Sequence, residues 1–458
     1  MSLTIRKMIS FGEYIKKLDE RLQRYIPPKE DWNPPEQAVY GVKDLYNVPL
    51  EKAKKLQFKA VKFQFKRHYE KNRFYRKLCE IRNVDPDDIK SYDDLKKIPL
   101  LQDKFFKDYP GGKEFAVWLS NIFTGDIPTV RIRRHHPTYD DVIRAFNSAG
   151  LAISYSSGTS GKHTFIPRDK RTFNIAEYAF AKAIVTMVYP LWEYNISAYL
   201  LMPNPFKTNL FAGKVCSVLY DAVKEVTPAI DREITTETIR LVMSRRGIRS
   251  SFIRFASAIA GRRLIRNIAR WLEEKEKKKE KIAFVGAPYI AYEVIEYLKR
   301  EGKTFDFSGR GGVITGGGWK IHENKRLPIR DFIREVNEVL GINEEHCLDV
   351  YAMVEGNGIM VHCPEGHHLH IPITYLHPMV VDKDLNPVEY EEYGRFAFLD
   401  GTTYSYPGFI ISGDRVRMLE RCPVCDRPGP VLEPEIKRAK GEEIRGCAEE
   451  MRKMLTID

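Results

Sequence analysis

The sequence predicts a layered α/β fold in which sheets are covered by helices and a smaller β-rich unit follows. From about residue 146 to 350, short apolar segments alternate with helical segments, a pattern typical of parallel sheet with covering helices. From about 351 to 435 the apolar segments come closer together, as expected for a β-rich subdomain. The length of 458 residues also favours more than one structural unit. We therefore predict a mainly helical part (1–145), an α/β core (146–350), a β-rich subdomain (351–435) and a short C-terminal tail (436–458).

The elements follow from the apolar periodicity along the chain. In the helical part we predict helices over residues 11–25 and 50–79, separated by a proline-rich stretch. Strands are predicted in the core at 151–155, 198–202, 214–219, 282–285 and 312–315. In the subdomain they are predicted at 358–362, 369–373, 379–381, 395–399 and 409–411. The polar stretch 433–458 is predicted as one short helix.

The chain is basic, with a net charge of +12. Residues 232–281 hold fifteen Lys and Arg and six Glu, a net charge of +9, on a helical pattern. A solvated helix face explains such a run, and a docking surface for an acidic carrier or reductase protein, or for an anionic membrane, is the alternative. Neither zinc-finger spacing nor an aromatic RNA-binding signature occurs, so no nucleic-acid partner is expected. The heavy use of Lys, Arg and Glu is typical of thermophilic proteins.

The N-terminal residues, the apolar segments and the cysteines indicate in which cellular compartment the protein is expected. The N-terminal residues are charged and lack the apolar segment of a signal peptide. No stretch of about 18 uncharged apolar residues occurs, so no transmembrane segment is expected. The seven cysteines do not fit a secreted disulfide framework. We therefore expect a cytoplasmic protein.

A loop with phosphate-binding chemistry follows the apolar residues 151–153. It contains Ser156, Ser157, Gly158, Thr159, Ser160, Gly161 and Lys162. Glycines let backbone N–H groups approach an anion, hydroxyls add donors, and a lysine neutralises phosphate charge. The spacing is not that of a Walker loop, because Gly158 and Gly161 are only three residues apart. The loop is a candidate phosphate site, with an ordinary turn as the alternative.

Residues 155–162 resemble the phosphate loop of the acyl-adenylate-forming superfamily, and further motifs of that superfamily follow in the same order. Residues 315–319 resemble its glycine turn, which implies that Gly316, Gly317, Gly318 and Trp319 lie against adenine. Residues 349–355 resemble its Tyr-Gly-x-Thr-Glu motif, which implies nucleotide contact for Tyr351 and a magnesium ligand in Glu355. Ser412-Gly413-Asp414 resembles its Thr-Gly-Asp motif, whose aspartate binds the ribose.

Segments toward both ends of the chain resemble particular families within this superfamily. Residues 68–76 and 93–99 are similar to phenylacetate–CoA ligases, whereas 317–320 and 445–448 resemble the acyl-protein synthetase of the luminescence fatty-acid reductase. It implies the large N-terminal domain of such an enzyme, with the C-terminal domain largely absent, since only 20 residues follow the expected hinge at Lys437 and Arg438.

Departures from the family pattern raise two expectations about catalysis. Ala352 and Val354 replace the glycine and threonine of the Tyr-Gly-x-Thr-Glu motif, so one hydroxyl contact is lost. Lys320 directly follows the glycine turn and is a candidate cation for the α-phosphate, with a surface lysine as the alternative. In the acyl-protein synthetases a C-terminal cysteine accepts the acyl group, and Cys447 matches that position; an incidental thiol is the alternative.

Four residues form a candidate zinc site. Cys422 and Cys425 form a CxxC pair, and Cys363 precedes a histidine cluster that includes His370. Four S and N ligands with CxxC spacing are typical of structural zinc, and His370 is chosen because it enters a predicted strand, as in related ligases. A CxxC pair without metal is the alternative.

The predicted function is activation of an aryl or fatty carboxylic acid by ATP and Mg²⁺ to acyl-AMP, followed by acyl transfer to Cys447 or to coenzyme A. The alternative is a non-catalytic nucleotide-binding partner in an acyl-transfer complex.

Overall fold

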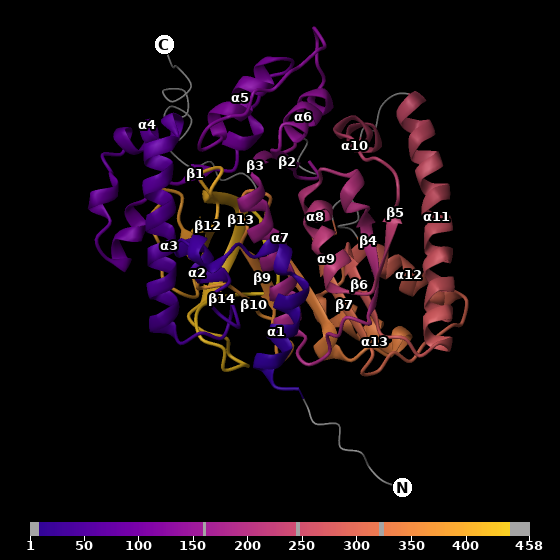
Figure 1. The fold of residues 1–458 in the computed structure, drawn as a ribbon. Helices are drawn as coiled ribbons and strands as arrows, with labels where there is room; N and C mark the ends of the chain where they lie inside the picture. Colours follow the sequence, from indigo (N-terminus) through magenta and orange to yellow (C-terminus); the bar gives the residue numbers. More distant parts are fainter. Residues whose placement is uncertain (1–8, 159–161, 244–247, 320–324, 440–458) are drawn as a thin grey trace.

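The computed structural model describes residues 9–158, 162–243, 248–319 and 325–439. Thirteen of the described strands form one mixed sheet, and β2 (Ala152–Tyr155) pairs with β3 (Phe165–Arg168) in a separate hairpin (Figure 1). The predicted α/β fold of sheet and covering helices is confirmed.

Half of the large sheet is parallel. Its strands lie side by side in the order β5 (Glu225–Ile230), β4 (Ser197–Pro203), β6 (Ile282–Gly286), β7 (Gly311–Gly316) and β8 (Cys347–Ala352). Parallel strands need crossover connections, and helices supply most of them. The carboxyl ends of these strands therefore meet along one edge.

The other half is antiparallel and continues from β8 without a break. Its strands follow in the order β9 (Ile359–His362), β10 (Leu369–His370), β14 (Val431–Leu432), β13 (Phe409–Leu419), β12 (Tyr393–Asp400) and β11 (Leu376–Val381). Two short strands, β1 (Leu101–Gln102) and β15 (Lys437–Arg438), also pair with β13. The strands of the predicted β-rich subdomain thus belong to the same sheet as the parallel core.

Helices cover both faces of the parallel half because its side chains alternate in direction. Val285 and Ile314 pack with the buried face of α7 (Lys170–Met187). Their neighbours Phe284 and Val313 pack on the opposite side. The helices of that side are α11 (Ile248–Lys277), α12 (Pro288–Arg300) and α13 (Ile329–Leu340), which stand apart from α1 and α3 in Figure 1.

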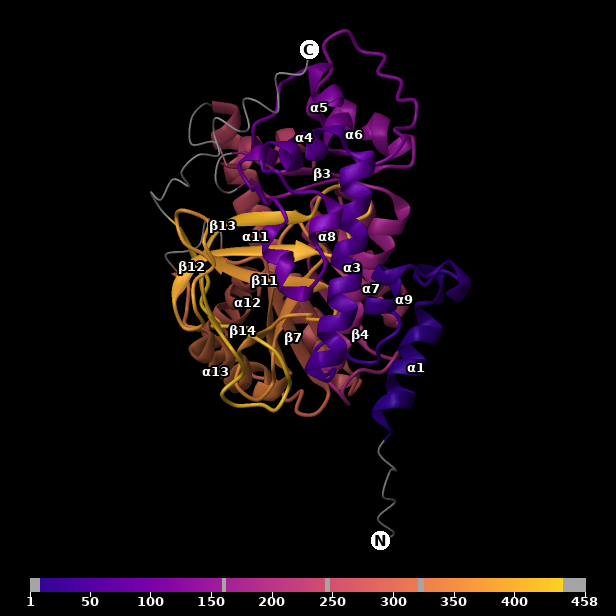
Figure 2. The ribbon, with the colours of Figure 1, turned by 90° about the vertical axis from the view of Figure 1, so that its left-hand side faces the viewer.

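The remaining helices belong mainly to the N-terminal part. They are α1 (Phe11–Arg21), α2 (Pro34–Val39), α3 (Leu50–Lys71), α4 (Arg73–Ile81), α5 (Glu114–Ile122) and α6 (Tyr139–Ser148). Figure 2 shows α3 running along the molecule beside the antiparallel strands, with α5 and α6 at one end. Three short helices follow in the chain: α8 (Phe211–Lys214) contacts β2, α9 (Leu219–Ala222) contacts β5, and α10 (Thr236–Met243) contacts α6 and α11. Among the described residues, none of the helices combines the length and the apolar character needed to cross a bilayer.

Several predicted elements need correction. The predicted strand at 214–219 is wrong, since α8, a 3-10 helix (Val215–Val218) and α9 occupy this stretch. Buried apolar residues recur there at positions 215, 218, 219 and 222, which is a helical spacing. The predicted helix 50–79 is two helices, because Asn72 caps α4 by accepting a hydrogen bond from the Tyr75 N–H at 2.8 Å. In the tail, β15 replaces the start of the predicted helix, and residues 440–458 lie outside the described residues.

Candidate functional site

A cleft of about 2480 Å³ opens at the carboxyl ends of the parallel strands. The last residues of β4, β6, β7 and β8 line it, which is where open α/β sheets bind ligands. Ser156, Glu355 and Asp414 line the same cleft. The structure therefore brings residues from all four predicted motifs to one place.

The β2–β3 hairpin holds the start of the predicted phosphate loop. The Ser156 N–H donates to the Thr164 carbonyl at 3.0 Å, and the Ser156 hydroxyl accepts from the Thr164 N–H at 2.9 Å. Gly158 has a φ of +68°, and a Cβ there would lie 2.8 Å from His163 Nδ1, so this position requires glycine. Ser156, Ser157 and Gly158 face the cleft.

Of the remaining loop residues, the structure describes only Lys162. Thr159, Ser160 and Gly161 lie outside the described residues. Lys162 is exposed at the loop's end, with its Nζ 4.0 Å from an Asp108 carboxylate oxygen, and it is not among the residues that line the cleft.

The glycine turn at the end of β7 also lines the cleft. Gly316, Gly317 and Gly318 line the cleft, and the last two have φ values of +80° and +68°. Trp319 also borders it, but the indole is buried and packs edge-on against Tyr292, with ring centroids 5.5 Å apart. This packing anchors the turn to the helices behind the sheet. Lys320 lies outside the described residues.

Tyr351 and Asp414 meet across the cleft. The Tyr351 hydroxyl donates to Asp414 Oδ2 at 2.7 Å. Arg438 Nε lies 3.2 Å from Asp414 Oδ1, because β15 pairs Arg438 directly with Asp414. Burial raises the pKa of Asp414, whereas Arg438 opposes that shift. The carboxylate is thus oriented by a phenol and a guanidinium at the edge of the cleft.

Glu355 lies buried in the loop after β8, and a buried arginine holds that loop. Arg168 of β3 donates from Nη2 to the carbonyls of Val354 at 2.6 Å and Gly356 at 3.2 Å, on either side of Glu355. The same nitrogen lies 2.9 Å from the Tyr406 hydroxyl. Burial raises the pKa of Glu355, so a cation beside it would favour the ionised form. Arg168 was not predicted, because nothing in the local pattern marks it.

Two further charged residues near Asp414 were not predicted from the sequence. Asp103 and Lys107 line the cleft, although they come from the N-terminal part, about 300 residues earlier in the chain. Their only sequence signal is an i, i+4 pair of opposite charges. Asp349 is a further unpredicted polar residue of the lining, and it accepts a hydrogen bond from the Thr315 hydroxyl at 2.6 Å.

One part of the cleft is rich in apolar side chains and lies between β4, β5 and the described part of α11. Its apolar lining includes Leu210, Phe211, Ala229, Ile234, Leu264 and Ile265, and the charged residues Asp231, Arg232, Arg262 and Arg266 also border it. The total volume exceeds the 300–1,000 Å³ of an ordinary small-molecule site, so the cleft has room for a nucleotide and an apolar chain.

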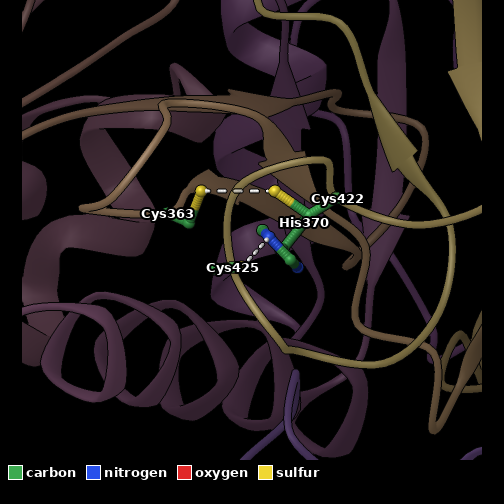
Figure 3. A group of neighbouring side chains, drawn as sticks. All are labelled: Cys363, His370, Cys422 and Cys425. Carbon is green, nitrogen blue, oxygen red and sulfur yellow. Dashed lines mark hydrogen bonds between the residues drawn. The ribbon is translucent and has the colours of Figure 1, made fainter.

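The four predicted metal ligands lie together on the antiparallel side (Figure 3). One ligand atom from each of Cys363, His370, Cys422 and Cys425 lies within 4.8 Å of the others. Cys363 Sγ and Cys422 Sγ are 3.9 Å apart, and Cys425 Sγ is 3.2 Å from His370 Nε2. The first three ligand residues are buried and Cys425 is half-buried. Three thiols and an imidazole at this spacing fit a tetrahedral soft-metal site.

The polypeptide brings these ligands together through two loops. Cys363 follows β9, His370 is in β10, and the CxxC pair lies in the loop between β13 and β14. The contact between Cys425 and both Cys363 and His370 lowers the pKa of the Cys425 thiol, as a metal-binding thiolate requires. Arg427 pairs with Glu365 at 2.7 Å and ties one loop to the other.

Comparisons with known proteins agree with this architecture. A family model described as acyl-protein synthetase, LuxE, matches residues 252–456. The long-chain-fatty-acid–luciferin-component ligase of Vibrio harveyi is 24% identical over 414 residues, covering 89% of this chain and 90% of that protein. The protein of the same name from Aliivibrio fischeri is 23% identical over 403 residues, covering 87% and 88%.

Solved structures show the same fold. The 2-hydroxyisobutyryl-CoA ligase in complex with 2-HIB-AMP and CoA superposes with a TM-score of 0.57 at 16% identity, covering 91% of this chain and 73% of that one. The same ligase in its postadenylation state with 2-HIB-AMP gives 0.55 at 15% identity, covering 92% and 75%. The chain is therefore similar to the LuxE acyl-protein synthetases over residues 252–456 and shares the fold of the 2-hydroxyisobutyryl-CoA ligase.

Proposed function

We propose that the protein activates a long-chain carboxylic acid with ATP, releases pyrophosphate, and transfers the acyl group from acyl-AMP to a thiol. The observation that carries this proposal is the convergence of Ser156, Glu355 and the Tyr351–Asp414 pair on one cleft. In the reaction the acid's carboxylate oxygen attacks the α-phosphorus. The bond from that phosphorus to the bridging oxygen breaks, and pyrophosphate leaves with the electron pair.

Each group has a role that its chemistry supports. Ser156, Ser157, Thr159, Ser160 and Lys162 contact the β- and γ-phosphates, and Asp414 accepts hydrogen bonds from the ribose hydroxyls. Adenine lies against Gly316, Gly317 and Gly318. Glu355 holds Mg²⁺, which supplies positive charge near the phosphates. Arg168 keeps Glu355 in place through the two flanking carbonyls.

The substrate class follows from the apolar region of the cleft. Side chains such as Phe211, Ile234 and Leu264 line it, and burying each CH₂ of an acyl chain contributes about 0.8 kcal/mol. The names of the two luciferin-component ligases point to the same class of acid. A long straight-chain acid therefore fits this site better than a short one.

Acid-dependent exchange of labelled pyrophosphate into ATP tests this function. The wild-type protein should exchange with long-chain acids, and Glu355→Ala or Lys162→Ala should lower the rate by roughly 10², the effect of losing one main electrostatic stabiliser. Glu389→Ala and Lys383→Ala change exposed residues and serve as matched controls with unchanged rates. Near-normal exchange in both site variants would refute the adenylation assignment. A wild-type protein that binds ATP without exchanging would instead be a non-catalytic partner.

The acceptor thiol is Cys447 or coenzyme A. Transfer to Cys447 gives an acylated protein, whereas transfer to coenzyme A gives acyl-CoA. Cys447 and the rest of the tail lie outside the described residues, so the proposal rests on the family position of this cysteine. Incubation with ATP and acid alone should add one acyl group to the tail peptide. Mass spectrometry should detect it in the wild type but not in Cys447→Ser, while pyrophosphate exchange persists in both. If no adduct forms and acyl-CoA accumulates equally with both proteins, coenzyme A is the acceptor.

The cysteine–histidine cluster is proposed to hold one structural zinc ion through Cys363, His370, Cys422 and Cys425. The support is the chemistry of the ligand set and its mutual distances. All four residues are used as ligands, so the ion would stabilise the fold and take no part in the reaction.

Metal analysis tests this site. The purified protein should contain about one zinc per chain, and Cys422→Ser should lose it with a fall in melting temperature on the order of 10 °C, because metal binding contributes folding free energy. Cys79→Ala alters a buried cysteine outside the cluster and should keep the metal. A metal-free wild type in which Cys422 and Cys425 are freely alkylated in the native state would reject the assignment.

A further inference from the structure

Asp103 and Lys107 reach the cleft because a short strand carries them there. In β1, Leu101 and Gln102 pair in parallel with Ile410 and Ile411 of β13. The Asp103 N–H extends this pairing by donating to the Ile411 carbonyl at 3.0 Å. One turn of 3-10 helix (Phe105–Lys107) then returns Lys107 to the level of Asp103. Both residues therefore lie beside the segment that ends in Asp414.

The two side chains form a partly buried ion pair. Lys107 Nζ lies 2.6 Å from Asp103 Oδ2, and the side chains are 19% and 14% exposed. A Cβ placed on Gly413 would lie 3.2 Å from that same Asp103 oxygen, so the carboxylate packs directly against the residue before Asp414. An ammonium group has three N–H donors, and the bond to Asp103 uses one of them. Two donors remain on this side chain, whose residue lines the cleft.

Lys107 shares the cleft lining with the proposed magnesium ligand Glu355 and the proposed ribose ligand Asp414. The 3-10 turn that ends in Lys107 packs against β3, whose Arg168 holds the loop of Glu355. Lys437 is the other described lysine that lines the cleft, and it is exposed on β15. Arg438 is already engaged by Asp414. The α-phosphate of a nucleotide lies between its ribose and its metal-bound phosphates, so Lys107 is the lysine of the described residues that is placed to meet it.

We propose that Lys107 is a catalytic residue that donates hydrogen bonds to an α-phosphate oxygen while the acid attacks, with Asp103 as its positioning residue. This inference rests on the proposed adenylation. The ammonium keeps its protons throughout. It stabilises the negative charge that accumulates on the α-phosphate oxygens as the new P–O bond forms and the bond to pyrophosphate breaks. Because that charge grows toward the transition state, Lys107 should affect the rate of the step more than the binding of ATP.

Kinetics and calorimetry on single and double variants test the role. Lys107→Ala should lower the maximal rate of acid-dependent pyrophosphate exchange by roughly 10², while calorimetry gives a Kd for ATP within about threefold of wild type. Lys107→Arg should recover part of the rate because it keeps the charge. Asp103→Asn/Lys107→Ala removes both charges and should be as slow as Lys107→Ala, which excludes an effect of the unpaired carboxylate. Lys104→Ala, on the exposed side of the same turn, should exchange like wild type.

The outcomes separate this inference from the function on which it rests. If the wild type exchanges pyrophosphate and Lys107→Ala exchanges it at the same rate, the role of Lys107 is overturned and adenylation stands. A slow Lys107→Ala variant that also loses ATP binding or melts at a much lower temperature would show a structural role and would equally overturn it. Absence of exchange in the wild type would refute the adenylation assignment, and the inference with it.

Discussion

The hydrogen bond between Tyr351 and Asp414 joins two strands that the sheet itself keeps apart. Tyr351 is in β8 and Asp414 is in β13, and three strands lie between them in the order of the sheet. The bond can form only because the sheet bends back on itself at β9, β10 and β14. The bend brings Asp414 of β13 into the same cleft lining as the ends of β7 and β8, so the position of the proposed ribose ligand depends on it.

Two of the strands at the bend are very short. β10 and β14 have two residues each, and so few ladder hydrogen bonds leave their angle poorly fixed. The cluster of Cys363, His370, Cys422 and Cys425 lies at this point and cross-links the loops of β9, β10 and β13. A bound metal would therefore fix the bend, and with it the distance from Tyr351 to Asp414.

The sequence alone predicted those parts of the site that are contiguous in the chain. The segments around Ser156, Gly316, Tyr351 and Asp414 each carry a local pattern, and the CxxC spacing pointed to the cysteine cluster. In contrast, Lys107 reaches the cleft through the pairing of β1 with β13, which links residues more than 300 positions apart. Arg168 acts through two backbone carbonyls, which no sequence pattern records.

For the fold, too, the features that were predicted correctly are those with a local sequence pattern. Alternation of apolar segments and helices indicated the parallel sheet, since that signal is local. The stretch 214–219 was mistaken for a strand because a short apolar run does not distinguish a strand from a buried helical turn. That the antiparallel strands extend the parallel sheet, as β9 does by pairing with β8, is a property of strand order, and periodicity carries no information about it.

A crystal structure with a long-chain acyl-sulfamoyl adenosine, a stable mimic of acyl-AMP, tests the central claim most directly. The claim is that one bent sheet forms a single site for nucleotide and acyl chain. The account predicts ribose hydroxyls on Asp414, adenine against Gly316–Gly318, the sulfamoyl group beside Lys107, and the chain along Phe211 and Leu264. A mimic bound elsewhere, or one whose chain leaves the cleft without touching this apolar lining, would contradict it.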